Sequence, residues 1–335
     1  MRYLKSETYR KDIETAIKHT IGFDVFSGKS VLILGASGLI GSFITDCFIY
    51  ANEYLGTEIK VHVVSRNIER LEERFGNDIK GYLNFIKADV TTMDIKFPFD
   101  YMIHGASYGH PTAFREMPVE VLLSNVIGTQ RALEIAKLNA GCRVLYISSG
   151  EVQEYVDHLS VRACYPMGKR AAETLCISYN KEYGIDVMIA RPSHTFGANV
   201  LKSDNRATAQ FIAAAARGIN IEMNSAGEQV RTFSYVADCA SGLLTTLAGG
   251  ESGTVYGISS GESCSIRDFA DKCADVGKSR VEIHVPSDNE KAEMSPIRNQ
   301  IVDNRSLRDL GWYPAFSIED GIAESIKIIS EMSGI

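Results

Sequence analysis

The chain alternates short, continuous apolar runs with longer segments whose apolar residues recur at helical spacing. Six apolar runs, rich in β-branched residues, predict strands at 30–35, 60–65, 82–88, 100–105, 142–148 and 185–190. A strand that is apolar along its whole length is typical of a parallel sheet covered by helices on both faces. The pattern therefore predicts an α/β fold built on a doubly wound parallel sheet of the Rossmann type.

The pattern changes on either side of this region. Residues 5–19 have the spacing of an amphipathic helix, so we expect an N-terminal helical extension over residues 1–28. After residue 195, polar loops separate helices that we expect near 206–217, 236–248, 265–276 and 317–332. We therefore expect a dinucleotide-binding domain over 29–195. A smaller, discontinuous substrate-binding lobe should cover most of 196–335 and return in part to the first domain.

Charge and composition narrow the class of protein. The 335 residues carry 35 basic and 42 acidic side chains, a net charge of -7, and form no long basic run, which argues against nucleic acid and membrane surfaces as partners. No apolar run approaches the roughly 20 residues of a membrane span, and the charged first residues differ from a signal peptide. The 7 cysteines are scattered without a CxxC pair, so we expect neither a disulfide nor a metal site. A cytoplasmic protein that acts on small molecules is expected.

A glycine-rich turn follows the first predicted strand. In "VLILGASGLIGSF" the glycines have a GxxGxxG spacing at the start of a helix, where glycine permits a tight turn and a close approach to a pyrophosphate. This context predicts a dinucleotide site. We expect cofactor contacts from Gly35, Ser37, Gly38, Leu39, Ile40 and Gly41.

The next strand bears on the choice of cofactor. It ends in Ser65-Arg66-Asn67, without the carboxylate that would hold the adenosine ribose of NAD. Arg66 could pair with the 2'-phosphate of NADP, or it could be a solvated residue that opens a helix. NADP is favoured and NAD remains open. Asp89, after the third strand, could accept a hydrogen bond from the adenine amino group or could simply form a turn.

Tyr165 and Lys169 lie four residues apart at the start of a helical segment, so both side chains should share one helix face. An ammonium beside the phenol would lower the pKa of the tyrosine from about 10 towards neutrality and make it a usable general base. Ser149 ends the preceding strand, and the carboxyl ends of parallel strands are where such sheets bind ligands. The alternative is a helix with an exposed lysine and a partly buried tyrosine.

Motifs along nearly the whole chain resemble those of the extended short-chain dehydrogenase/reductase superfamily, which includes nucleotide-sugar epimerases, dehydratases and decarboxylases. They are "GASGLIG", "HGAS" at 104–107, "SNVIGT" at 124–129, "ISSGEV" at 147–152, the Tyr165 and Lys169 pair, "RPSHTFG" at 191–197, "RTFSYVADCASGL" at 231–243 and "LGWYP" at 310–314. The resemblance implies an enzyme that uses NAD or NADP and acts on a nucleotide-diphosphate sugar.

The resemblance also implies roles for individual residues. Ser149 would hydrogen-bond the sugar 4'-hydroxyl, Tyr165 would take its proton, and Lys169 would hold the phenolate and the nicotinamide ribose while hydride passes from C4' to the nicotinamide. Arginines would grip the substrate diphosphate. The expected sites are Arg231, with Arg298 as a second candidate, for the diphosphate; Ser107, His194 and Gln210 for other substrate contacts; and Val90, Gly105, Ala106, Ser107, Asn125 and Pro192 for the cofactor.

The segment Ser149-Gly150-Glu151 bears on the reaction. It resembles the Thr-Asp-Glu of sugar 4,6-dehydratases and the Thr-Ser-Glu of UDP-glucuronate decarboxylases, which would place Glu151 near C5' and C6'. Gly150 cannot donate the proton that a dehydratase aspartate supplies. A 4'-keto-uronate is a β-keto acid and can lose carbon dioxide without that donor. The loop "ASYGHPTAF" and the segments "CYPMGKRAAETL" and "RTFSYV" also resemble the decarboxylases.

A nucleotide-uronate decarboxylase is therefore the favoured interpretation. Two segments depart from the decarboxylase pattern, "EVQE" at 151–154 and "RPSH" at 191–194. A 4- or 5-epimerase, a 4,6-dehydratase, a reductase and a non-catalytic dinucleotide-binding protein remain open. The resemblance also implies a homodimer, formed as a four-helix bundle by the helix that contains Tyr165 and the helix after Asn125.

Overall fold

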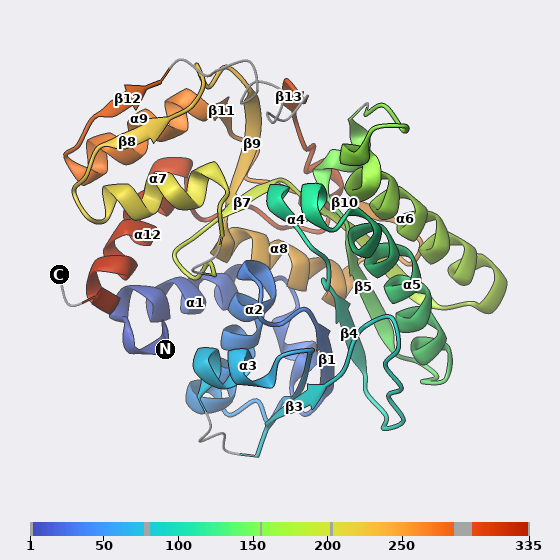
Figure 1. Ribbon diagram of the computed structural model, residues 1–335. Coiled ribbons are helices and arrows are strands. Elements are labelled where there is room, and N and C mark those ends of the chain that lie inside the picture. Colours follow the sequence, from blue (N-terminus) through green and yellow to red (C-terminus); the bar gives the residue numbers. More distant parts are fainter. Residues whose placement is uncertain (1–2, 77–80, 155, 202–203, 285–296, 334–335) are drawn as a thin grey trace.

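The computed structural model describes residues 3–76, 81–154, 156–201, 204–284 and 297–333 (Figure 1). A parallel sheet of seven strands lies at its centre, in the order β10-β6-β5-β4-β1-β2-β3. The order places strands from the two halves of the sheet side by side at β1 and β4, as in a doubly wound sheet. The strands are β1 (Ser30–Leu34), β2 (Lys60–Ser65), β3 (Leu83–Lys87), β4 (Tyr101–His104), β5 (Arg143–Ile147), β6 (Asp186–Pro192) and β10 (Val255–Ile258).

The six predicted strands and the Rossmann-type fold class are confirmed, and the seventh strand, β10, comes from the C-terminal part of the chain. Strand β1 shows why its run is apolar throughout: Val31 and Ile33 pack into one core, and Leu32 and Leu34 into the core on the other face. Helices α2 (Leu39–Tyr50), α3 (Ile68–Phe75) and α8 (Val236–Gly249) contribute to the first core. Helices α5 (Pro118–Lys137) and α6 (Cys164–Tyr183) contribute to the second and lie side by side (Figure 1).

A smaller group of strands and helices lies beside the carboxyl end of the sheet (Figure 1). Its strand β9 (Val230–Tyr235) pairs with β7 (His194–Phe196), β11 (Ser263–Ser265) and β13 (Asn299–Gln300), while β8 (Ile221–Met223) pairs with β12 (Val281–Ile283). Helices α7 (Ala207–Ala215), α9 (Ile266–Gly277) and α12 (Ile318–Ser333) pack around them. The rings of Phe196, Phe233 and Phe269 contact one another there, and the capping box of Ser265 and Asp268 begins α9.

The N-terminal helix α1 (Glu7–His19) connects these two parts. Tyr9 donates a hydrogen bond to Asp46 of α2 at 2.9 Å, while Asp12 accepts one from Tyr235 of β9 at 2.6 Å. Burial raises the pKa of Asp12 to about 7. The helix is therefore part of the packed interior, and its start lies near the end of α12 (Figure 1).

Short elements complete the described chain. They are the helices α4 (Pro111–Glu116) and α11 (Arg305–Arg308), 3-10 turns at Tyr3–Lys5, Phe23–Phe26, Gly150–Gln153 and Val161–Ala163, and a π-helical turn at Ala51–Leu55.

Among the described residues, no helix has both the length and the apolar character that a membrane span requires.

Candidate active site

A cavity of about 1170 Å³ opens at the carboxyl ends of the central strands. Its wall includes the β1–α2 turn, residues 105–107 after β4, Ser148 and Ser149 after β5, and Gln229 and Arg231 of the smaller part. This edge of a doubly wound sheet is where such folds bind ligands. The cavity therefore joins the predicted cofactor turn to the predicted catalytic residues.

The β1–α2 turn depends on two of its glycines. Gly35 has a φ of +96°, and a Cβ there would lie 2.8 Å from the backbone of Gly105 and Ala106. A Cβ on Gly41 would lie 2.4 Å from the Gly35 carbonyl oxygen. Helix α2 begins at Leu39, and no described side chain caps its first N–H groups. Those groups can bind a phosphate, so the turn fits the pyrophosphate of a dinucleotide.

Arg66 and Asp89 line the same cavity and pair with each other, Nη1 to Oδ2, at 3.7 Å. The Arg66 guanidinium also lies 5.0 Å from the centre of the Tyr108 ring. Partial burial raises the pKa of Asp89, but hydrogen bonds from Thr91 and the charge of Arg66 outweigh it, and the net shift is downward. Both predicted adenosine contacts are thus charged, and each is already oriented by a neighbour.

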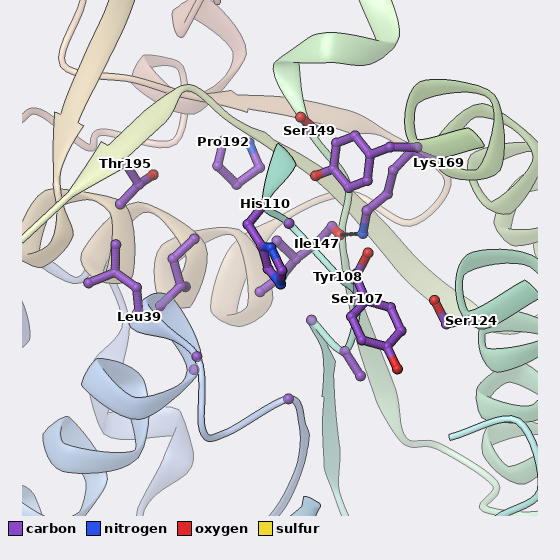
Figure 2. A pocket seen from close by; sticks show the side chains of 18 of the residues that line it. Leu39, Ser107, Tyr108, His110, Ser124, Ile147, Ser149, Lys169, Pro192 and Thr195 are labelled. Carbon is purple, nitrogen blue, oxygen red and sulfur yellow. Dashed lines mark hydrogen bonds between the residues drawn. The ribbon is translucent and has the colours of Figure 1, made fainter. Parts of the chain in front are cut away.

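Lys169 lines the cavity, and its side chain reaches the backbone of β5. Its Nζ donates to the Ile147 carbonyl oxygen at 2.7 Å (Figure 2) and lies 6.0 Å from the centre of the Tyr165 ring. Only 3% of Lys169 is exposed, and this burial lowers its pKa to about 7. The ring of Tyr146, 4.9 Å away, forms part of its surroundings.

The predicted fall in the pKa of Tyr165 is wrong. Burial raises that pKa to about 12, and the charge of Glu151 adds to the rise. A hydrogen bond with Ser149 and the charges of Arg162 and Arg206 act in the opposite direction. The shared helix face brings Lys169 near Tyr165, as predicted, but its ammonium is directed at a carbonyl, and desolvation of the phenolate dominates.

Glu151 is held by an arginine that the sequence analysis did not identify. Arg162 Nη2 lies 2.6 Å from Glu151 Oε2, and both residues line the cavity. The Ser149 Oγ accepts a hydrogen bond from the Glu151 N–H at 3.1 Å, which starts the 3-10 turn at Gly150–Gln153. Arg162 precedes Tyr165 by three residues, and that proximity was the available sequence signal.

Gly150 faces two buried residues from a distant part of the chain. A Cβ at Gly150 would lie 2.6 Å from Val302 Cγ2 and 3.0 Å from Gln300 Nε2. Gln300 also lines the cavity, although only 7% of it is exposed. The space for a side chain at position 150 is therefore already filled. No local pattern could have indicated this contact, since the residues lie far apart in sequence.

The remaining predicted contacts divide into two groups. Ser107, Val90 and Pro192 line the cavity, as does His194, whose pKa burial lowers to about 3, so its ring is neutral. Arg231 lines it too. The structure does not bring three other side chains to the cavity wall, namely those of Asn125, Gln210 and Arg298.

The hydrogen bonds of these residues explain their placement. Asn125 donates to the Val121 carbonyl at 2.7 Å within α5, and Gln210 to the Asn205 carbonyl at 3.0 Å. The Arg231 guanidinium donates to the carbonyls of Ile297 and Arg298 at 2.6 and 3.0 Å, so it fixes the segment that precedes β13. Arg298 thus contributes a backbone acceptor here.

Residues 31–259 match the NAD dependent epimerase/dehydratase family. The chain is 30% identical over 313 residues to UDP-glucuronic acid decarboxylase 1 of Xenopus tropicalis, covering 89% of this chain and 71% of that protein. It is 29% identical over 309 residues to UDP-glucuronic acid decarboxylase 6 of Arabidopsis thaliana, covering 88% and 87%.

Solved structures show the same fold. The epimerase Mth375 of Methanothermobacter thermautotrophicus superposes with a TM-score of 0.78 at 18% identity, covering 94% of this chain and 96% of that one. The Bordetella bronchiseptica enzyme WbmF, in complex with NAD+, superposes with a TM-score of 0.75 at 23% identity, covering 92% and 94%.

Proposed function

Because the chain belongs to the NAD-dependent epimerase/dehydratase family, we propose that it is a nucleotide-sugar enzyme, and specifically a nucleotide-uronate decarboxylase. The observation that carries the proposal is the joint presence of Ser149, Tyr165, Lys169 and Glu151 in one cavity that the glycine-rich β1–α2 turn also lines. Relatives that match over most of the chain include UDP-glucuronic acid decarboxylases.

The cofactor would be held by the chain's own residues along the cavity wall. The β1–α2 turn would bind its pyrophosphate, and Lys169, next to the Tyr165 ring, its nicotinamide ribose. When bound, the oxidised nicotinamide would accept hydride from C4' and return it to the sugar at the end of the cycle.

Tyr165 would accept the proton of the 4'-hydroxyl, and Ser149 would orient that hydroxyl by a hydrogen bond. The resulting 4'-ketone makes the substrate a β-keto acid, so carbon dioxide can leave C5' while its bonding electrons move into the C4' carbonyl. Glu151 would then govern delivery of a proton to C5'. Each role needs only a residue that already lines the cavity.

Gly150 argues against dehydration of the sugar as the main reaction. Elimination of the 6'-hydroxyl needs an acid that protonates the leaving group, and glycine has no donor side chain. The buried side chains of Val302 and Gln300 occupy the space beside it, so an acid cannot be accommodated there without repacking.

Mass spectrometry of the purified protein incubated with UDP-glucuronate and cofactor tests the proposal. We expect the product to have lost the mass of carbon dioxide, with no net change in reduced nicotinamide over many turnovers. Loss of water, or an isomer of unchanged mass, would replace the proposal with dehydration or epimerisation. Stoichiometric consumption of reduced cofactor would indicate a reductase, and bound cofactor without any turnover a binding protein.

We further propose that Arg66 makes NADP the preferred cofactor. A guanidinium binds phosphate through paired N–H groups, and β2 ends without the carboxylate that would favour the ribose of NAD. Fluorescence titration should show Arg66→Ala weakening NADPH binding by about tenfold while NADH binding changes little. Arg70→Ala is the matched control, because Arg70 is an arginine of α3 that lines the same cavity. Equal losses for both cofactors would contradict the proposal.

We also propose a homodimer formed through α5 and α6. Large apolar side chains on these two helices are exposed outside the cavity, a typical feature of an interface, at Leu122 and Ile177. Sedimentation should give twice the chain mass, and Leu122→Lys with Ile177→Lys should yield a monomer. A monomeric wild-type protein at micromolar concentration would exclude the proposal.

A further inference from the structure

Arg162 contacts both Glu151 and the ring pair that includes Tyr165. Its Nη2 lies 2.6 Å from Glu151 Oε2, and its guanidinium lies 4.6 Å from the centre of the Phe114 ring. That ring stacks on Tyr165 with centres 4.8 Å apart and planes 26° apart. Arg162 Nη1 is buried without a hydrogen-bond partner in the part of the chain that the structure describes. The cation is thus enclosed between a carboxylate and an aromatic stack.

The other cations near the site are held by different partners. Arg206 forms a two-pronged pair with Asp204, with a closest distance of 2.6 Å. Arg231 donates to backbone carbonyls, and Lys169 donates to Ile147. Of these four cations, Arg162 is the one that contacts Glu151.

The proposed chemistry makes two negative charges neighbours. Tyr165 must become a phenolate close to the Glu151 carboxylate, and like charges oppose each other's formation. Burial is the main cause of the raised pKa of Tyr165, and the charge of Glu151 raises it further, whereas the charge of Arg162 lowers it. The titratable and charged groups that face Tyr165 are Glu151, Arg162, Cys164, Arg206, Lys169 and Tyr146.

We propose that Arg162 is a positioning residue that orients Glu151 and offsets its negative charge at Tyr165, so that the carboxylate and the phenolate can exist together. This inference rests on the proposed function, because it requires Tyr165 to act as the base in the 4'-oxidation. It assigns to Arg162 no contact with the reacting atoms. It also explains how the carboxylate proposed for the later step can remain beside the base needed for the first.

The test measures the pH dependence of the first oxidation. Full-length protein with bound cofactor is mixed with UDP-glucuronate, and the appearance of reduced nicotinamide is followed in a single turnover. Arg162→Gln should move the acid limb of the rate profile upward by about one pH unit, and Glu151→Gln should move it downward. The double variant should lie near wild type, because both charges are gone. Arg162→Lys keeps the positive charge, so its acid limb should lie close to that of the wild-type protein.

Arg115→Gln is the control, since Arg115 follows Phe114 in sequence but is exposed and pairs with Glu116 at 3.2 Å. It should leave the limb in place. A uniform loss of rate in Arg162→Gln with an unmoved limb would overturn the inference and leave a structural role. If Arg162→Gln does not fold, Glu151→Gln still tests the inference. An acid limb that Glu151→Gln leaves unmoved would show that the charge of Glu151 does not act on Tyr165, so Arg162 would have no charge to offset.

This outcome can be separated from failure of the proposed function. If the final product is not decarboxylated, the oxidation step still reports on Arg162. If Tyr165→Phe oxidises the sugar as fast as wild type, the base assignment fails, and the proposal for Arg162 fails with it.

Discussion

The contact of Gly150 with Val302 allows a quantitative test of whether position 150, where a dehydratase has its acid, has room for a side chain. In Gly150→Ala the new Cβ would lie 2.6 Å from Val302 Cγ2. Valine is stiff about its first side-chain torsion, and Val302 is 3% exposed, so it cannot turn aside into solvent. The Gln300 amide, at 3.0 Å, can move more easily because it is the end of a flexible side chain.

The expected cost follows from these contacts. Overpacking of this kind costs about 1–3 kcal/mol, and the lower backbone entropy of unfolded alanine returns about 0.4–1 kcal/mol. Gly150→Ala should therefore destabilise the protein by about 1.3 kcal/mol, the middle of a range of about 0–2.6 kcal/mol. In a Val302→Ala background the obstructing methyl is absent, so the same substitution should be neutral or stabilising. The coupling energy between the two positions should be about 2 kcal/mol.

Urea unfolding of the four proteins in this cycle measures the coupling. The single tryptophan, Trp312, is fully buried and donates to Ser241 of α8 at 2.9 Å, so its fluorescence reports on the packed interior. An equal effect of Gly150→Ala in both backgrounds would refute the steric reasoning.

Three further predictions concern the catalytic residues. Tyr165→Phe should keep cofactor binding and lose most turnover, about 10²-fold or more, and activity within a few-fold of wild type would exclude Tyr165 as the base. Glu151→Gln should allow 4'-oxidation but impair the later step, so an unaltered product profile by mass spectrometry would exclude a role for Glu151. The pKa of Lys169 is about 7 in the folded protein and 10.5 in the unfolded chain. Between these two pH values the unfolded chain therefore binds more protons at this residue than the folded protein does. Unfolding midpoints of the ligand-free protein should therefore rise with pH across that window relative to Lys169→Met, and parallel curves would contradict the assignment.

Local sequence was sufficient for six of the seven strands of the central sheet. Apolar runs of β-branched residues predicted β1, β2, β3, β4, β5 and β6 to within one or two residues at each end. The seventh strand, β10, was not predicted, because its four residues include a glycine and follow a loop. Its place beside β6 depends on pairing between distant segments, which periodicity does not record.

Some features of the candidate site could likewise be predicted from local sequence, and others could not. The glycine spacing predicted the β1–α2 turn because Gly35 and Gly41 each answer a backbone constraint within a few residues or across neighbouring strands. The interval between Tyr165 and Lys169 predicted their shared helix face. It could not predict the direction of their pKa shifts, because desolvation depends on all the surrounding atoms, and Lys169 donates to a strand remote from its own helix.

The sequence by itself therefore determined six strands of the Rossmann-type sheet, the glycine-rich β1–α2 turn and the presence of a tyrosine–lysine pair, since each follows from chain geometry over short intervals. Only the tertiary structure decided which charges meet. It placed Arg162 against Glu151, directed Arg231 to backbone carbonyls and brought Val302 over Gly150. These contacts depend on how separate elements pack, because electrostatic and steric effects act through space rather than along the chain.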